Sequence, residues 1–433
     1  MVADKWTRYL YRGGDNHRYR DGREVLSDKG FRAAPGSFDA QIIPAGRMAP
    51  RWARDLLRVA KAVYLADRAE VRDRADDKWT RSFDLRIQVE DCAPWRGPIL
   101  DSLSLMLRIL TSDHWNIELI EGATDQGPPD ALPGFQKTVG EVALFSGGVD
   151  STCYAAGRSA ASEQARFVCY TIPKLKKRQY GVYARVIGAG VDERLRAISA
   201  LATSRELTNR SRGLLFVTTA VYVAAAFRCG RVIIPENGQL AINPPLTGAR
   251  IGACSTRSVH PLVLSIANEI VRSIGGDVEI NNPYLRYTKA EVCKKALASG
   301  ISEDVLIDTV SCSHPPLVRS GGRFFHCGYC FPCMIRRSAL VNALGRDCTP
   351  YAVNFWEIPW KNDKASDVYA VLNWLNRSFS QYDVIADVAL PQNLSVAETL
   401  SMLQRGRDDL SFMIDELVPP NHSFRRLLAS IPE

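Results

Sequence analysis

No stretch of this sequence is apolar for long enough to cross a membrane. A spanning helix needs about 20 consecutive apolar residues, and the 433 residues contain no such run. The N-terminal sequence MVADKWTRYLYRGGDNHRYR also lacks the apolar segment of a secretory signal peptide. We therefore expect a cytoplasmic protein without membrane contact, whose eleven cysteines serve as thiols and metal ligands rather than as disulfides.

The sequence also lacks a lysine- or arginine-rich tail and any basic stretch interleaved with aromatic residues. The net charge of +8, from 55 basic and 47 acidic residues, is modest. It suits a protein that binds ATP or another anion, and it does not require nucleic acid. We expect no direct nucleic-acid binding. There is no internal repeat and no low-complexity segment, and the length predicts two or three domains.

The order of the predicted elements divides the chain into an N-terminal α+β domain (1–135), a central domain (136–347) and a C-terminal helical region (348–433). A segment dense in proline and glycine, 127–134, is the predicted linker after the first domain. Within that domain, apolar spacing predicts helices over 52–66 and 99–110 and strands over 83–89 and 115–120. The C-terminal region shows helical spacing over 365–379, 396–417 and 423–428 but no evident chemistry, so it is expected to pack on the core or on a partner.

In the central domain, predicted strands alternate with predicted helices. This alternation is typical of an α/β fold, a doubly wound parallel sheet with helices on both faces. The predicted strands are 142–145, 167–172, 182–187, 232–235 and 278–280. The predicted helices are 192–202, 211–227, 261–274 and 288–299.

The segment EVALFSGGVDST, 141–152, is the clearest functional signal. A short apolar strand stops at Ser146-Gly147-Gly148, and a segment compatible with a helix follows. Two glycines allow a tight turn whose N–H groups approach an anion, and the next helix N-terminus adds unpaired N–H groups. Ser151 and Thr152 add hydroxyl groups. Asp150 is an unsuitable phosphate ligand, but it suits a role in holding Mg²⁺ or orienting the loop.

No lysine follows the second glycine, so the segment is not the common G-x-x-x-x-G-K-[ST] nucleotide loop. The sequence S-G-G-V-D-S instead resembles the pyrophosphate loop (PP-loop) of the ATP pyrophosphatases, which cleave ATP between its α and β phosphates. The alternative is an ordinary turn between strand and helix, capped by Asp150. The resemblance implies that ATP is bound by Ser146, Gly147, Gly148, Val149, Asp150, Ser151 and Thr152.

A cysteine cluster is the second signal. Cys327, Cys330 and Cys333 form a C-x2-C-x2-C pattern, and Cys312 lies 15 residues upstream. Four thiolates suit a closed tetrahedral Zn²⁺ site with a structural role. His314 and His326 are nearby competitors for ligation, and an iron–sulfur cluster is the alternative metal centre.

Loop and cluster together resemble the 7-cyano-7-deazaguanine synthases (the QueC family of queuosine biosynthesis) over about 141–344. The matching pieces are LFSGGVDST at 144–152, RGLLF at 212–216, PYLRYTKAE at 283–291, and SC at 311–312 with HCGYCFPC at 326–333. The synthases lack the N-terminal domain and the C-terminal region, and the segment 233–261 also differs. It is similar to long QueC-like proteins of bacterial anti-phage defence (the Qat type).

The family resemblance implies an enzyme that uses Mg-ATP to adenylate a 7-deazaguanine carboxylate for attack by an amine. It implies that Asp150, Lys289 and Arg212 act in catalysis. Polar residues beyond the predicted strand 232–235 suggest an acceptor pocket made of Glu236, Asn237, Gly238, Arg257 and His260. For His260, which precedes a proline, a structural hydrogen bond is the alternative.

Three functions follow from these expectations. The extra domains suggest an amine acceptor larger than ammonia, such as a partner protein of the same defence system. A second hypothesis is plain nitrile synthesis, with the extra regions used for assembly, including a homo-oligomer. A third is a nucleotide or deazapurine sensor or scaffold without turnover. Sulfur insertion into tRNA is a weaker alternative, because no free catalytic cysteine or RNA-binding region is evident.

Overall fold

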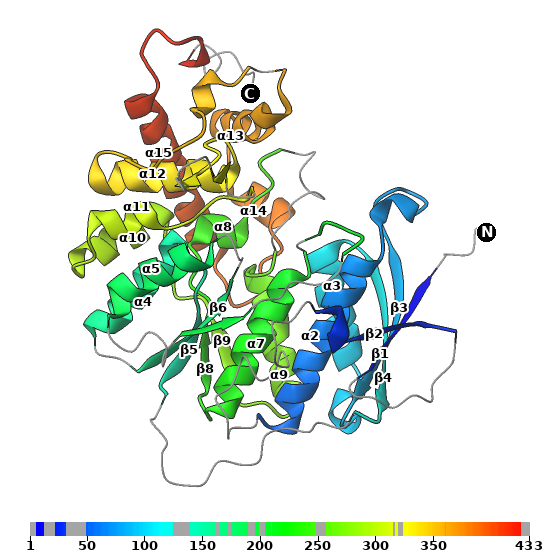
Figure 1. Cartoon of the computed structure of the whole chain (residues 1–433). Coiled ribbons are helices and arrows are strands. Elements are labelled where there is room, and N and C mark those ends of the chain that lie inside the picture. The colour runs from blue at the N-terminus through cyan, green and yellow to red at the C-terminus, as the bar shows by residue number, and fades with distance from the viewer. Residues whose placement is uncertain are drawn as a thin grey trace.

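The fold is described from a computed structural model of the chain (Figure 1). The described residues are 6–12, 22–31, 49–123, 139–161, 164–171, 175–188, 195–198, 204–208, 210–247, 257–314, 317–318, 324–359 and 361–425. The predicted linker 127–134 and the predicted boundary at 135 fall outside them. No helix among the described residues is long and apolar enough to span a membrane.

The central sheet has five parallel strands in the order β7-β6-β5-β8-β9. The strands are β5 (Glu141–Leu144), β6 (Ala165–Tyr170), β7 (Leu195–Ile198), β8 (Arg231–Ile233) and β9 (Glu279–Asn281). In chain order this is 3-2-1-4-5, the doubly wound arrangement in which the winding reverses between β5 and β8. Ligands in such sheets bind at the carboxyl edge beside this reversal. The predicted parallel α/β sheet is confirmed.

Helices cover both faces of the central sheet. The helices α4 (Val149–Ala160), α5 (Lys176–Ile187) and α10 (Lys289–Ala298) share one apolar core with one face. On the other face, α7 (Arg212–Ala226) and α9 (Pro261–Ser273) contribute to a second core. Alternate strand residues divide between the two, as with Val142 and Ala143. This burial on both faces explains the continuous apolar runs that predicted the strands.

Two predicted elements of this domain are wrong. The predicted strand 182–187 lies within helix α5, and the predicted helix 192–202 contains strand β7 instead. The buried side chains of α5 are Gln179, Val182, Tyr183 and Ile187, which recur at helical spacing. The misreading arose because Val182 to Ile187 alone resembles a short apolar strand, whereas the spacing including Gln179 indicates a helix.

The N-terminal unit is an α/β unit, not the predicted α+β domain. Its strands β1 (Thr7–Arg12), β2 (Glu24–Ser27), β3 (Ser82–Val89) and β4 (His114–Glu121) form a sheet in the order β2-β1-β3-β4, and all three pairings are parallel. The alternating polarity along β3 and β4 predicted half-buried strands, and the strands are there. It arises because these parallel strands alternate between the core and more exposed polar positions.

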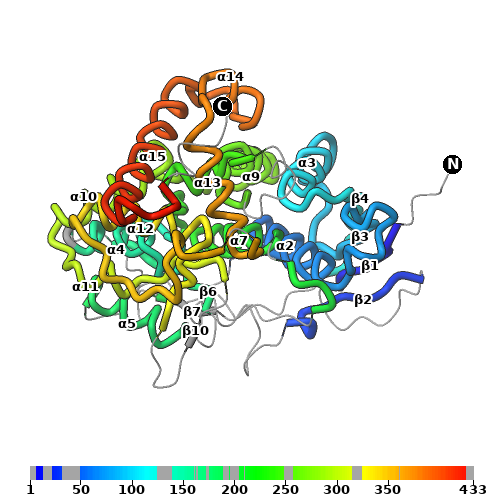
Figure 2. Tube along the Cα trace, turned by 90° about the horizontal axis from the view of Figure 1, so that it is seen from above, coloured from blue at the N-terminus to red at the C-terminus, as the bar shows by residue number. Residues whose placement is uncertain are grey.

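The helices α2 (Arg51–Ala69) and α3 (Ile99–Thr111) join this unit to the central one. Figures 1 and 2 place them between the N-terminal sheet and helices α7 and α9. Their buried faces belong to the same apolar core as α7 and α9, with Leu57 and Val63 of α2 among the members. The N-terminal unit is therefore packed onto the central sheet through a shared core.

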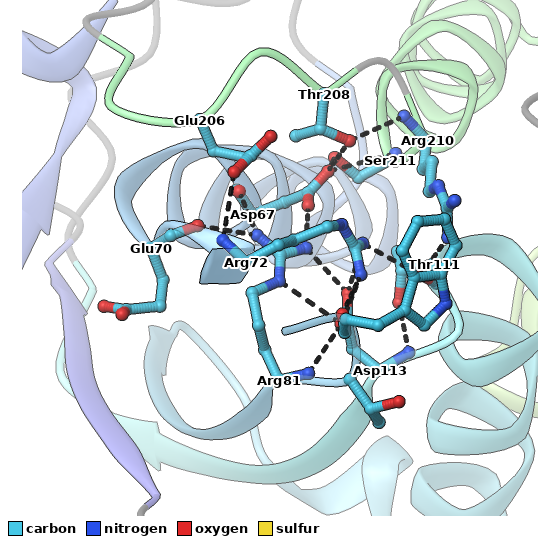
Figure 3. A network of polar contacts seen from close by, with 12 residues as sticks. Asp67, Glu70, Arg72, Arg81, Thr111, Asp113, Glu206, Thr208, Arg210 and Ser211 are labelled. Carbon is cyan, nitrogen blue, oxygen red and sulfur yellow. Dashed lines mark hydrogen bonds and ion pairs between the residues drawn. The ribbon is translucent and has the colours of Figure 1, made fainter. Parts of the chain in front are cut away.

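A buried charge network closes this junction (Figure 3). Arg81 donates to Asp67 at 2.5 Å and to Asp113 at 2.7 Å, and all three side chains are buried. Arg72 adds a second contact to Asp113 at 2.9 Å. Asp67 also accepts the backbone N–H of Ser211, the residue before α7. The network thus fixes the start of α7 to the N-terminal unit.

The C-terminal helices pack on the central unit. These are α12 (Phe331–Leu344), α13 (Ser366–Asn376), α14 (Gln381–Asp387) and α15 (Val396–Leu417). They share a core with the short helix α8 (Gly238–Ile242), which follows β8. The bounds of α15 match the prediction, and the C-terminal region packs on the core, the first of the two expected alternatives.

Replacement of Asp113 by alanine should destabilise the protein by about 3–5 kcal/mol, because Arg72 and Arg81 would lose a buried carboxylate. Urea unfolding followed by circular dichroism measures the change. The control is Glu303→Ala, which removes an exposed partner of Arg346 and should cost at most about 1 kcal/mol. Equal effects of the two substitutions would contradict the structural role of the network.

Candidate active site

The Ser146–Thr152 loop lies at the carboxyl end of β5, beside the reversal of the sheet. Gly147 has φ +74°, a left-handed conformation that favours glycine. Gly148 is the N-cap of α4. Within the loop, the N–H of Ser146 donates to Ser151 Oγ and that of Gly148 to Ser146 Oγ, both at 3.2 Å. The hydroxyl groups of the motif therefore define the curvature of the loop.

The remaining residues of the motif differ in what they can offer a ligand. Val149 is buried in the apolar core, so its side chain packs and only its backbone faces the helix terminus. The Thr152 hydroxyl is buried and has no hydrogen-bond partner among the described residues. Asp150 Oδ1 is likewise buried and unpartnered within the described part of the chain. These orphaned oxygens are available to a cation or a bound ligand.

Three ionisable side chains meet behind the loop. Lys289 Nζ donates to Asp150 Oδ2 in a close contact and lies 4.0 Å from Glu236 Oε1. Lys289 and Asp150 are both buried. Asn237 donates to Asp150 Oδ2 at 3.3 Å and to Glu236 Oε1 at 2.9 Å. The structure thus brings together residues from β5–α4, from the end of β8 and from α10.

Local sequence explains the position of Lys289. Thr288 caps α10, and the Thr288–Glu291 pair forms a capping box, with Thr288 Oγ1 accepting from Glu291 N and Glu291 accepting from Thr288 N. Lys289 is therefore the first residue of the helix. Its backbone N–H donates to Gln239 Oε1 at 3.1 Å, which ties α10 to α8.

The charges of this group are interdependent. Burial, followed by the charge of Asp150, raises the pKa of Glu236 to about 8 even though Lys289 opposes the shift. Burial lowers the pKa of Lys289, but the Asp150 and Glu236 carboxylates outweigh it, so that the net pKa is raised. Lys289 is therefore charged and pairs with Asp150, while Glu236 keeps its proton at neutral pH. A cation beside Asp150 and Glu236 would favour loss of that proton.

Gly238 and Asn237 also have structural roles. Asn237 Oδ1 accepts from the N–H of Leu240 at 3.2 Å and caps α8. A Cβ on Gly238 would lie 2.2 Å from the carbonyl oxygen of Leu285 and 2.6 Å from Met402 of α15. Glycine is required there by packing. The C-terminal helix α15 thus supports the segment that carries Glu236 and Asn237.

The other predicted pocket residues, Arg257 and His260, lie at the N-terminus of α9. His260 caps α9, with its Nδ1 accepting from the N–H of Leu262 at 3.3 Å. Burial, followed by the charge of Arg257, lowers the pKa of His260 to about 4. This geometry gives His260 the structural hydrogen bond named as the alternative. Arg257 begins the same turn, where its carbonyl accepts the N–H of His260.

Arg212 is placed apart from the Asp150 group. It is the first residue of α7, and its guanidinium lies 5.6 Å from the centre of the Phe216 ring. Burial lowers the pKa of Arg212, and its electrostatic neighbours are Tyr64 and Arg68 of α2. The Phe216 ring stacks on Tyr170, at the end of β6, with 3.8 Å between centroids. A catalytic role for Arg212 remains a prediction.

Gln179 is a residue that the sequence reasoning missed. It is buried on α5, and its Nε2 donates to the carbonyl oxygen of Ser146 at 2.8 Å. A Cβ on Gly147 would lie 2.9 Å from Gln179 Cγ. Gln179 therefore supports the loop from behind and explains the need for Gly147. The helical spacing of α5 is the sequence signal that would have placed it here.

The cysteine cluster assembles as predicted from the spacing. Ligand atoms of Cys312, His314, Cys327 and Cys330 lie within 4.8 Å of one another, and Cys333 Sγ is 3.7 Å from Cys327 Sγ. The N–H of Cys330 donates to Cys327 Sγ at 3.3 Å, which would stabilise a thiolate. Contacts among the four thiols lower the pKa of Cys312 to about 7. This donor set fits a metal ion such as zinc.

The two histidines near the cluster, His314 and His326, differ in exposure and in their hydrogen bonds. His314 is exposed and lies within reach of the cluster, so it remains a candidate ligand. His326 is buried, and its Nε2 accepts the N–H of Ser311 at 3.2 Å. Burial, followed by the charges of Arg336 and Arg178, lowers the pKa of His326 to about 2. His326 is therefore a neutral hydrogen-bond acceptor beside the cluster.

Comparisons with known proteins do not place the chain in a family. No family model matches it, and no curated protein matches it. Among solved structures, a reductase domain from the aureusimine biosynthetic cluster aligns with 63% of this chain and 92% of its own length, at 11% identity and a TM-score of 0.23. An agreement this low says nothing about function.

From the cysteine cluster, we expect purified protein to contain about one metal ion per chain. Replacement of Cys330 by serine should abolish the bound metal and lower the midpoint of thermal unfolding, because a structural site contributes to folding. Metal content by inductively coupled plasma mass spectrometry checks this. The control, Cys348→Ser, changes an exposed cysteine outside the cluster. Undiminished metal in the Cys330 variant would rule out the site.

The raised pKa of Glu236 leads us to expect that the free energy of unfolding depends on pH. Because its folded pKa is raised above the unfolded value, the group contributes stability at low pH, and this contribution is lost as the pH rises through about 8. Between pH 7 and 9 the wild type should lose about 1 kcal/mol relative to Glu236→Gln, which cannot titrate. Urea unfolding of both proteins at a series of pH values measures this difference. Parallel curves would show that Glu236 does not titrate in this range.

Proposed function

We propose that this chain is a PP-loop ATP-dependent ligase that adenylates a 7-deazaguanine carboxylate and releases pyrophosphate. One observation carries the proposal. Lys289 contacts both Asp150, in the S-G-G-V-D-S loop, and Glu236, and the three residues lie where the winding of the sheet reverses. Asp150 and Lys289 come from segments that the QueC resemblance matched, and Glu236 comes from the segment 233–261, which differs from the synthases. Their convergence at one sheet edge supports a single ATP site.

The loop and helix α4 would bind the phosphates of ATP. The N-terminus of α4 offers backbone N–H groups and the positive end of the helix dipole. In the reaction, a carboxylate oxygen of the substrate attacks the α phosphorus, the bond to the bridging oxygen breaks, and pyrophosphate leaves. Lys289 keeps a positive charge next to Asp150, and electrostatic stabilisation of this kind dominates phosphoryl and nucleotidyl transfer.

Asp150 and Glu236 are the residues that would hold Mg²⁺. The unpartnered Oδ1 of Asp150 and the carboxyl group of Glu236 offer the oxygen ligands that this cation prefers. Bound Mg²⁺ would supply positive charge to the phosphates. The raised pKa of Glu236 means that cation binding releases a proton there, so binding should strengthen as the pH rises toward 8.

The amine acceptor defines the physiological role. We propose a role in anti-phage defence, with transfer of the activated deazaguanine to an amine of a partner protein. The N-terminal unit supports this proposal, because α2 shares a core with α7 and brings Tyr64 and Arg68 close to Arg212. Nitrile formation from ammonia is the alternative product of the same activated carboxylate.

The test is pyrophosphate release from Mg-ATP with 7-carboxy-7-deazaguanine, with mass spectrometry of the products. Release should depend on the deazaguanine and fall at least about 100-fold in Asp150→Asn, which keeps the shape but removes the charge that holds Lys289. The matched control is Asp304→Asn on α11 (Glu303–Asp308), a carboxylate remote from the loop in sequence. ATP binding without release for any deazapurine would favour the sensor function instead.

A further inference from the structure

A short strap, residues 309–312, runs between the loop and the cysteine cluster. On the loop side, the N–H of Val310 donates to the carbonyl oxygen of Gly147 at 2.9 Å. The carbonyl oxygen of Val310 lies 3.1 Å from where a Cβ on Gly148 would be. The strap therefore touches both glycines of the loop.

On the cluster side, the strap is held by residues of the cysteine motif. The N–H of Ser311 donates to His326 Nε2 at 3.2 Å, and Cys333 Sγ approaches the carbonyl oxygen of Ser311 at 3.8 Å. The next residue, Cys312, is itself a member of the cluster. Every backbone polar group of Ser311 is thus engaged by a residue of the metal-binding segment.

Helix α12 holds the upstream end of the same strap. Arg336, which lies one turn after Cys333, is fully buried. Its guanidinium donates to Thr309 Oγ1 and, at 2.9 Å, to the carbonyl oxygen of Leu306. The strap is therefore fixed at Thr309 by Arg336, at Ser311 by His326, and at Cys312 by the cluster. Between these fixed points, Val310 makes the hydrogen bond to the loop.

We propose that the strap couples the metal site to the phosphate loop, so that an intact cysteine cluster holds Gly147 and Gly148 in place. His326 is the positioning residue of this coupling. Its ring is not among the side chains that could hold the metal ion, and it acts through Ser311. The inference rests on the proposed function only in treating the loop as a phosphate site, since the contacts themselves link the cluster to the loop.

Hydrogen–deuterium exchange of a peptide covering 144–152 tests the coupling without requiring activity. In His326→Ala, which removes the acceptor for Ser311, exchange of this peptide should rise about tenfold. His326→Gln should restore protection, because its amide oxygen can accept the same N–H. Tyr351→Phe is the matched control. Its ring neighbours His326, but its hydroxyl donates to Asp347 rather than to the strap.

Metal removal is the second arm of the test, and it needs no substitution. Wild-type protein stripped by a chelator should show the same rise in exchange at 144–152, while peptides of α2 stay protected. The His326→Ala variant should retain its metal, because His326 is not a ligand. Unchanged exchange at 144–152 in the stripped protein, with α2 still protected, would overturn the coupling.

Binding of a non-hydrolysable ATP analogue with Mg²⁺, measured by calorimetry, separates this inference from the proposed function. Affinity should fall about tenfold in His326→Ala and recover in His326→Gln. If the wild type binds no nucleotide, the proposed function fails, and the exchange data still decide whether the strap couples the two sites. If the wild type binds ATP and His326→Ala binds it equally, the strap has no positioning role.

Discussion

Two carboxyl groups and one ammonium group meet at the carboxyl edge of the central sheet, where Asp150 and Lys289 are buried and the Glu236 side chain is 29% exposed, and this imbalance of charge governs the site. Asp150 and Lys289 neutralise each other in direct contact. Within the described part of the chain no second cation pairs with Glu236, and its partial burial, followed by the charge of Asp150, raises its pKa to about 8. An extra buried charge is costly unless it is paired. The group is therefore one positive charge short of accommodating both carboxylates, which makes it receptive to a cation.

The rest of the structure holds these three residues and the loop in position relative to one another. The capping box at Thr288 sets Lys289 at the start of α10. Packing of Gly238 against α15 sets the segment that carries Glu236. Gln179 and the strap both hold the loop. Each support comes from a different part of the chain, so the arrangement depends on the complete fold, including the C-terminal helices.

The sequence predicted well what depends on local pattern. Uninterrupted apolar runs predicted strands of the central sheet, and the spacing of apolar residues predicted the long helices, α15 with its observed bounds. The spacing of the cysteines predicted the cluster. The sequence also indicated Asp150 from the loop motif itself, and Lys289 through the resemblance alone. It failed between β6 and β8, where α5 is short, polar on its exposed side and begins with two lysines. Helical spacing could have placed Gln179 on the buried face of α5. The roles of Gln179 and His326 could not be predicted, because they arise from long-range contacts to a backbone carbonyl and a backbone N–H.

The N-terminal unit bears on what the site can do, because it cannot be separated cleanly from the central sheet. Its helix α2 shares a core with α7, and the Asp67–Arg81–Asp113 network binds Ser211, directly before Arg212. The position of Arg212 is thus determined as much by the N-terminal unit as by its own helix. Each of the helices α4, α7, α9 and α10 comes after a strand of the same parallel sheet, so their N-termini lie toward its carboxyl edge. The N-terminal unit fixes one of these helices, α7, and therefore shapes part of the surface that a ligand at this edge would contact. For the proposed ligase, this is the physical reason to expect the added residues to alter the acceptor rather than the activation step, to which we assign Asp150, Lys289 and the loop.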